Sequence, residues 1–246
     1  MNARVLLEIC CDSVDACVEA EQGGADRIEL CAALSEGGLT PSLGTLELAL
    51  ERVRIPIVVL VRPRRGDFVH TATERETVVR DVLHAKKAGA HGVALGALLP
   101  DGSIDRDALC EFVRAARPLS ITFHRAFDHA RDPLAALETL IELGVDRVLT
   151  SGGAATAPEG AARIAELVRA ARGRITLLAG GGVRPANVRA LVDATGVREV
   201  HATARELAAS VATHRPASPV FDSSPPGAWE LHATRAERVR ALRAVL

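Results

Sequence analysis

Short apolar runs alternate along the chain with longer segments whose apolar residues recur at helical spacing. In one such segment, Leu134, Leu137 and Ile141 would lie on the same helix face. The apolar runs recur roughly every 28 residues. They begin near Val5, Asp26, Ile57, His91, Leu119, Asp146, Arg174 and Arg198. Strands that alternate with helices form a parallel sheet, and eight such units in about 200 residues predict a closed α/β TIM barrel, (β/α)₈, rather than an open sheet.

Glycine and proline mark where the predicted helices end and begin. Four junctions between a helix and the next strand carry a glycine that suits the left-handed conformation of a helix end. These are Gly24, Gly89, Gly144 and Gly196. The pairs Thr40-Pro41 and Asp132-Pro133 match the preferred N-cap and first-turn residues. They predict two helix starts.

No linker or shift in composition interrupts residues 1–205. A Pro- and Ser-rich stretch near 216–227 is typical of an irregular loop. The segment from Glu230 to Leu246 then places Val239, Leu242 and Leu246 on one helix face. We therefore expect a single TIM-barrel domain over residues 1–246, with a decorated last unit and a C-terminal helix.

Polar and titratable residues collect where the predicted strands end. In a TIM barrel, these carboxyl ends and the loops that follow them carry the chemistry. The expected catalytic set at this mouth comprises Glu8, Glu29, Arg62, His124, Arg125 and Asp128. A structural alternative stays open, in which these groups form ion pairs that fill the top of the barrel.

Alternation along the first two strands predicts which side chains point into the barrel. Glu8 shares a face with Cys10, Glu29 repeats that arrangement with Cys31, and the opposite faces are fully apolar. Burial of two carboxylates is costly unless cations pair with them. We expect these cations to come from other strand ends. The candidates are Arg62, His124 and Arg125.

The loops after the seventh and eighth strands of a TIM barrel often hold a phosphate on backbone N–H groups. Gly180, Gly181 and Gly182 follow the predicted seventh strand, and Thr203 would lie at the start of the helix after the eighth. These four residues predict an anion site, although glycine triplets also form tight turns. His201 on the eighth strand suits either acid–base chemistry or a hydrogen-bonded core position.

Cys10 and Cys31 hold equivalent positions on neighbouring strands. Soft thiolates select Cu(I) or Zn²⁺ over hard ions. A pair of thiolates is enough for Cu(I), whereas zinc usually takes four ligands, and the chain has no CxxC pair and no HExxH motif. Cys10 and Cys31 are therefore candidate metal ligands that favour Cu(I) over a structural zinc site. The alternative is that both thiols are small core residues.

Charge and composition exclude several kinds of partner. Lys and Arg total 30 against 31 Asp and Glu, for a net charge of -1, and aromatic residues make up 2%. This chain lacks the basic field and the stacking platform of nucleic-acid-binding proteins. No apolar run approaches the roughly 20 residues of a membrane span, and the first residues lack a signal-peptide pattern. We expect a cytoplasmic protein with no organic cofactor, no nucleic acid and no membrane partner.

Several motifs together resemble the CutC family of copper homeostasis proteins. They include LEICCDSVDACVEAEQGGADRIELC (7–31), LSEGGLTPSLG (34–44), VRPRRGDF (61–68), TFHRAFD (122–128), RVLTSGG (147–153), AGGGVRPANV (179–188) and VHATAR (200–205). The resemblance implies a cytoplasmic TIM barrel, often a homodimer, that binds or moves copper, with Cu(I) at thiols matching Cys10 and Cys31. Ala202 and Thr203 depart from the family's common Ser pair but leave a backbone anion site intact.

Two functions remain open. The first is a copper homeostasis protein that binds or traffics Cu(I). The second is an enzyme acting on a small phosphorylated or carboxylated compound, with one Glu as base and His124 as acid. In that case Arg62 or Arg125 would hold the anion and stabilise an oxyanion. The partner is accordingly a copper ion or a small anionic ligand.

Overall fold

Eight parallel strands pair in chain order and close into a barrel, because β8 returns to pair with β1. The computed structural model describes residues 4–214 and 229–246. The barrel strands are β1 (Leu6–Cys11), β2 (Arg27–Leu30), β3 (Ile57–Leu60), β4 (Gly92–Leu95), β5 (Ser120–Phe123), β6 (Arg147–Thr150), β7 (Thr176–Gly180) and β8 (Glu199–Ala202). They begin within two residues of the predicted starts. The expected TIM barrel is confirmed.

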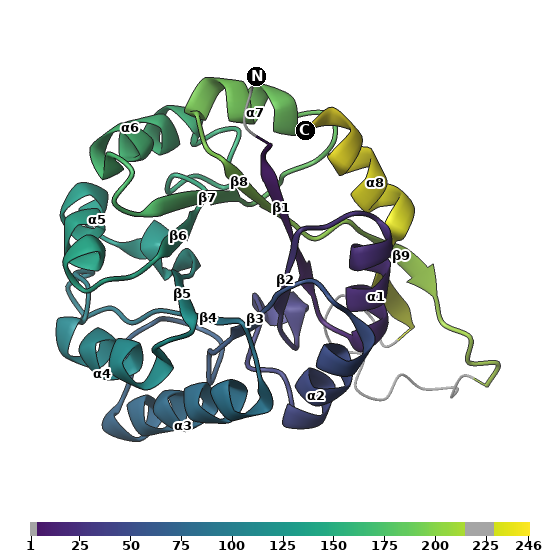
Figure 1. Ribbon diagram of the computed structural model, residues 1–246, viewed down its shortest axis with the longest axis horizontal. Coiled ribbons are helices and arrows are strands. Elements are labelled where there is room, and N and C mark those ends of the chain that lie inside the picture. Colours follow the sequence, from purple (N-terminus) through teal and green to yellow (C-terminus); the bar gives the residue numbers. More distant parts are fainter. Residues whose placement is uncertain (1–3, 215–228) are drawn as a thin grey trace.

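Helices surround the barrel, as the outer ring of ribbons in Figure 1 shows. They are α1 (Val14–Gln22), α2 (Leu43–Arg52), α3 (Ala72–Ala88), α4 (Arg106–Ala116), α5 (Pro133–Glu142), α6 (Ala161–Ala171), α7 (Val188–Thr195) and α8 (Ala236–Val245). Short 3₁₀ turns follow β2 and β5, namely η1 (Leu34–Glu36) and η2 (Arg125–His129). Across the described ranges, no helix is both long enough and apolar enough to cross a membrane.

The helix ends follow the sequence signals with one exception. The four junction glycines all adopt positive φ, and Asp132 caps α5 by accepting hydrogen bonds from two backbone N–H groups. The predicted start at Thr40 is wrong, because α2 begins at Leu43 with Ser42 as its N-cap. The Thr40 hydroxyl is instead bonded to the backbone of Arg62 at the end of β3. It therefore fastens a loop to the barrel mouth.

The core divides into an outer and an inner part, as the alternation of the strands requires. The outer core lies between sheet and helices and includes Leu7, Ile9 and Cys11 from β1. A small inner cluster gathers Cys10, Cys31, Val58, Leu60 and Ala94. One face of each strand thus packs against helices, and the other lines the barrel interior.

The chain departs from a simple barrel after β8. It forms an antiparallel hairpin of β9 (Arg205–Ala209) and β10 (Glu230–Thr234) before α8, and the hairpin projects from the barrel in Figure 1. The start of the predicted final helix is therefore wrong, since Glu230–Thr234 is a strand. Val239 and Leu242 of α8 are buried as expected. The loop predicted near 216–227 lies outside the described residues.

Candidate functional site

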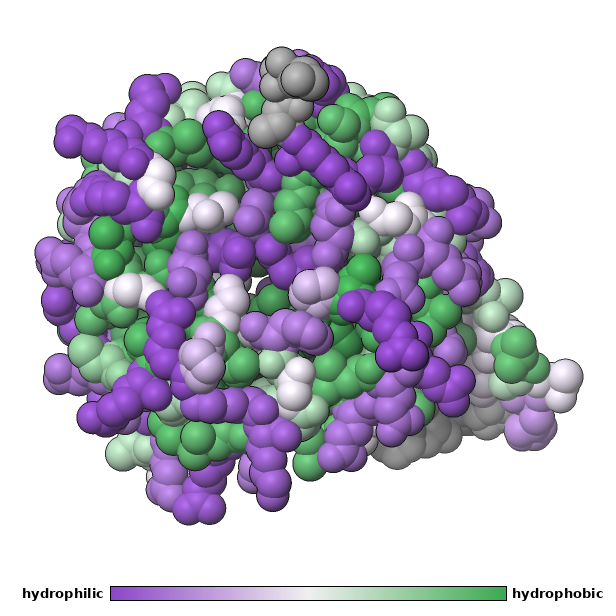
Figure 2. Space-filling view, viewed as in Figure 1, coloured by the Kyte–Doolittle hydropathy of each residue, from purple (hydrophilic) through white to green (hydrophobic). Residues whose placement is uncertain are grey.

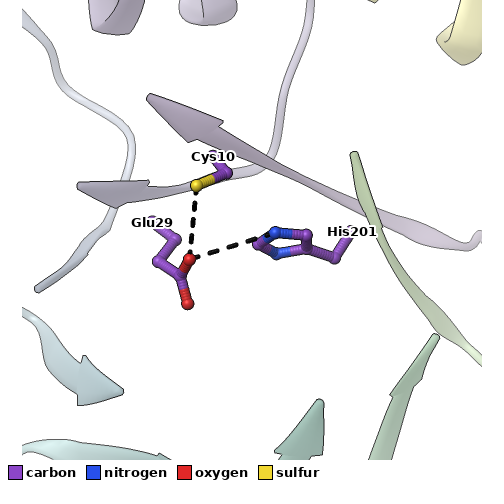
Figure 3. Close-up of side chains that lie close together, drawn as sticks. All are labelled: Cys10, Glu29 and His201. Atoms are coloured by element: carbon purple, nitrogen blue, oxygen red, sulfur yellow. Dashed lines mark hydrogen bonds and ion pairs between the residues drawn. The ribbon is translucent and has the colours of Figure 1, made fainter. Parts of the chain in front are cut away.

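Polar side chains from three neighbouring strands meet inside the barrel. Glu8 and Cys10 come from β1, Glu29 from β2 and His201 from β8. The strand register places Cys10 opposite Glu29 and Glu8 opposite His201. Figure 3 shows Cys10, Glu29 and His201 converging from these strands. The inward orientation expected for both carboxylates is observed.

Glu8 is a fully engaged carboxylate. It accepts hydrogen bonds from Arg27 Nε and from His201 Nδ1, the latter at 2.8 Å. Burial raises the pKa of Glu8, but the charge of Arg27 and the contact with His201 outweigh burial and lower it to about 2. Glu8 is therefore ionised at neutral pH and accepts a hydrogen bond from a protonated His201 Nδ1. This contact fixes the ring so that Nε2 is free to face Glu29.

Glu29 and His201 form a second pair closer to the thiols. Glu29 Oε2 lies 3.9 Å from His201 Nε2 and 3.4 Å from the Cys10 Sγ that donates to it. Burial raises the pKa of Glu29. Burial lowers the pKa of His201, but the charges of Glu29 and Glu8 outweigh burial, and that pKa is raised. A carboxylate and an imidazole shifted in this way can share a proton.

Arg27 supplies the main buried positive charge. It joins Glu8 to Glu199, with Nη2 at 2.6 Å from the Glu199 carboxylate. Arg147 approaches the same carboxylate at 2.8 Å. Arg27 is absent from the residues expected at the site, although its place two residues before Glu29 puts both side chains on one strand face.

Arg62 lines the mouth but neutralises neither buried carboxylate. Its Nη1 donates to the carbonyl oxygens of Glu36 and Gly38 at 3.1 and 3.2 Å, and Nη2 donates to that of Gly66 at 2.9 Å. The guanidinium also lies 5.0 Å from the centre of the Phe68 ring. The expectation that Arg62 pairs with a buried Glu is wrong, because loop carbonyls already hold its Nη1 and Nη2 donors.

His124 follows β5 as the N-cap of η2 and is also unpaired with the carboxylates. Its Nδ1 accepts a hydrogen bond from the Ala126 N–H at 3.2 Å, so Nε2 carries the ring proton. Burial, together with the charge of Arg62, lowers the pKa of His124 to about 3. The ring is therefore neutral at physiological pH and offers a neutral N–H donor rather than a cation.

Asp128 anchors the loop after β6 and forms an ion pair with Arg125. The Asp128 carboxylate accepts hydrogen bonds from the Thr150 hydroxyl, from Ser151 and Gly153 backbone N–H groups, and from Arg125 Nε at 2.8 Å. Its side chain is 6% exposed. These contacts consume its acceptor capacity and join η2 to the loop after β6. Arg125 thus pairs with Asp128, and the expectation that it pairs with a buried Glu is wrong.

Two thiols lie side by side next to this polar group. The Sγ atoms of Cys10 and Cys31 are 3.7 Å apart, and both residues are buried. The hydrogen bond with Cys31, burial and the charge of Glu29 all raise the pKa of Cys10. The two free thiols therefore pack against each other, and the Cys10 thiol is held in its protonated form.

A cavity of about 590 Å³ opens at the barrel mouth. Figure 2 shows the opposite end of the barrel, where the strands begin, and hydrophilic residues cover much of that face. Cys10, Glu29, His124 and His201 contribute to the lining of the cavity. Five arginines also line it, namely Arg62, Arg125, Arg184, Arg205 and Arg238. Within the described part of the chain, Glu29 is the one carboxylate in this lining, so the cavity is predominantly positive.

The glycine turn after β7 forms one wall of the cavity. Gly181 and Gly182 line it with φ of 102° and 68°. Gly180 packs below them, where an added Cβ would lie 2.6 Å from a methyl carbon of Leu149. Thr203 lines the cavity and is exposed, but the expectation that it begins a helix is wrong because β9 follows. Anion binding by these residues remains a prediction.

Comparison with known proteins assigns the chain to a family. Residues 5–206 match the CutC family. The chain belongs to the CutC family. It is 44% identical over 241 residues to the human copper homeostasis protein cutC homolog, and the alignment covers 98% of this chain and 88% of that protein. A CutC family protein of Xanthomonas campestris pv. campestris is 52% identical over 199 residues, with 81% of this chain and 83% of that protein covered.

A solved CutC structure has the same fold. The crystal structure of the CutC protein from Streptococcus agalactiae is 31% identical with a TM-score of 0.77, and covers 81% of this chain and 98% of that chain. The inner site of this CutC protein lies wholly within the matched residues 5–206, whereas β10 and α8 follow them.

Proposed function

We propose that this CutC protein serves copper homeostasis in the cytosol by binding one Cu(I) ion between Cys10 and Cys31. The observation that carries the proposal is the 3.7 Å separation of the two buried Sγ atoms. Two thiolates bind Cu(I) from nearly opposite sides, so bonds of about 2.3 Å, as for zinc, place the sulfurs up to roughly 4.6 Å apart, about 1 Å more than observed. The thiols therefore need little movement to share an ion, and thiolates are ligands that Cu(I) prefers.

Proton release should accompany this binding. The pKa of Cys10 is raised above its usual range, so the ion must displace a proton to form the thiolate bond. Metal affinity therefore rises with pH. The reducing cytosol keeps the two thiols from forming a disulfide, which supports that location for the function.

An anaerobic titration of reduced protein with Cu(I) against a competing chelator tests the proposal. We expect one tight equivalent in the wild type, its loss in Cys31→Ser, and its retention in Cys110→Ser, which alters an exposed thiol. Equal affinity in Cys31→Ser and wild type would mean that the thiols are core residues and not copper ligands.

A second candidate function is an enzyme that acts on a small anionic substrate. The cavity volume of about 590 Å³ is far larger than one ion needs and falls in the range of small-molecule sites. Its arginine lining would attract a phosphorylated or carboxylated compound. The neutral N–H of His124 could donate to a carbonyl or developing oxyanion, and the raised pKa of Glu29 suits a base.

Thermal stabilisation by phosphorylated and carboxylated metabolites tests this second candidate. We expect a subset of these anions to raise the Tm of the wild type and to lose the effect in Arg125→Gln. Arg163→Gln is the matched control, because Arg163 is an exposed helix residue paired with Glu166. The absence of any stabilising anion, or equal stabilisation of all three proteins, would refute it.

A further inference from the structure

We propose a second metal mode at the barrel mouth, in which Cys10 Sγ, Glu29 Oε2 and His201 Nε2 bind one Zn²⁺ ion and leave a fourth coordination position open to the cavity. The three residues offer ligand atoms that all lie within 4.8 Å of one another. They converge from β1, β2 and β8, as Figure 3 shows. This site uses different chemistry from the thiol pair and does not depend on copper binding.

The spacing of the ligand atoms suits zinc. With bonds of about 2.0–2.3 Å to nitrogen, oxygen and sulfur, neighbouring ligand atoms of a tetrahedral ion lie roughly 3.3–3.8 Å apart. The Cys10–Glu29 and Glu29–His201 distances are 3.4 and 3.9 Å. Small rotations of the side chains would therefore bring all three onto one ion without a change in the strands.

Glu8 orients the histidine as a metal ligand requires. Ligand imidazoles almost always donate their second ring N–H to a carboxylate, a carbonyl or water, which fixes the tautomer and the ring plane. His201 Nδ1 makes this contact with Glu8 at 2.8 Å, and Arg27 holds Glu8 from the other side. The imidazole is thus presented to the mouth through Nε2 before any ion arrives.

The donor set distinguishes the ion from Cu(I). One thiolate, one imidazole and one carboxylate form a borderline set of the kind that binds Zn²⁺, whereas Cu(I) prefers soft thiolates. Cys31 lies next to Cys10 but outside the three-residue group found among the described residues. The two modes therefore share Cys10 and differ in every other ligand, so the two ions should exclude each other.

The cavity completes the argument for an open coordination site. Cys10, Glu29 and His201 all line it, and Cys31 does not. Three protein ligands with an accessible fourth position are characteristic of zinc sites that bind water or a substrate, whereas structural sites are closed by four ligands. The arginine lining would then guide an oxygen of an anionic ligand toward the ion.

Calorimetric titration of the full-length protein with Zn²⁺ alone tests the site, together with the absorption spectrum of the Co²⁺ form. We expect one equivalent of Zn²⁺ and thiolate-to-cobalt absorption in the wild type. His201→Gln and Glu29→Gln should each lower the Zn²⁺ affinity at least about tenfold, the lower limit for losing an outer-shell partner. Cys31→Ser should keep it within about threefold, and His84→Gln, at an exposed histidine, should leave it unchanged.

The variants separate this inference from the copper proposal. Loss of Cu(I) in Cys31→Ser with Zn²⁺ retained, and the reverse in His201→Gln, supports both sites. If only Cu(I) binding fails, the proposed function is refuted and the zinc site is still supported. Wild-type protein that binds no Zn²⁺, or affinity unaffected by both His201→Gln and Glu29→Gln, overturns the zinc site. Affinity lost equally in Cys31→Ser also overturns it, because the ion would then belong to the thiol pair. Thermal unfolding of each variant establishes that it is folded, and the Co²⁺ spectrum of the wild type needs no substitution.

Discussion

Replacing Arg27 with leucine removes the cation that joins two buried carboxylates. Arg27 contacts Glu8 and Glu199, and its side chain is 7% exposed. Breaking a buried ion pair by removing one partner costs about 3–5 kcal/mol, because the remaining charge stays buried. His201 and Arg147 still serve the two carboxylates, so we expect Arg27→Leu to lose about 3 kcal/mol of unfolding free energy at pH 7, the lower end of that range.

The pKa of Glu8 gives an independent magnitude and a sign. It falls from 4.5 to about 2 although burial raises it, with Arg27 as the strongest opposing influence. That shift corresponds to about 3 kcal/mol. Because the folded pKa is depressed, this stabilisation is complete above pH 4.5 and is lost as the pH falls from about 4.5 to about 2. The stability gap between wild type and Arg27→Leu should therefore narrow by up to about 2 kcal/mol between pH 7 and pH 3.

Urea denaturation followed by circular dichroism at several pH values measures both effects. Arg80→Leu is the matched control, because Arg80 forms an exposed pair with Glu76 on α3, and such pairs contribute about 0.3–0.5 kcal/mol. A loss below about 1 kcal/mol at pH 7, or a gap that stays constant down to pH 3, would refute the reasoning that Arg27 neutralises Glu8.

Three further predictions concern loops and helix starts. Asp128→Ala removes the acceptor of the Ser151 N–H and hydroxyl and should cost about 2–3 kcal/mol in denaturation; an unchanged midpoint would contradict its anchoring role. Gly160→Ala would place a Cβ 1.9 Å from the Ser151 carbonyl oxygen and should abolish recovery of folded protein, whereas Gly44→Ala in α2 meets open space and should raise the Tm. Asp132→Ala removes the N-cap of α5 and should cost about 1 kcal/mol by denaturation, an effect that Asp132→Asn should largely spare.

The pattern of apolar and polar residues along the chain is enough to predict the barrel and the side chains that point inward from its first two strands. Alternation alone places Glu8 and Cys10 inside and the apolar Leu7 and Ile9 outside, as observed. The spacing of apolar runs also gives the number and order of the strands. These features depend on neighbours in sequence, which is why a single chain reveals them.

Features set by pairing between distant segments could not be read in the same way. The partner of Glu8 depends on the register of β1 with β2 and β8, so the residues at the strand ends do not reveal that Arg27 is this partner. The segment Arg205–Ala209 consists of residues that favour helices, yet pairing with Glu230–Thr234 makes it a strand. Tertiary contacts therefore overrode propensity at the point where Thr203 had been expected to begin a helix.

Closure of β8 onto β1 also sets an order in which ligands become available during synthesis. Cys10 lies in β1 and Cys31 directly follows β2, the first two strands to be synthesised, and these strands pair with each other. His201 reaches Glu29 only when the final barrel strand has been made and the ring has closed. Both thiols are thus synthesised early, whereas the three-residue group exists only in a finished barrel. An ion that binds to this group would therefore stabilise only the completed barrel, by mass action.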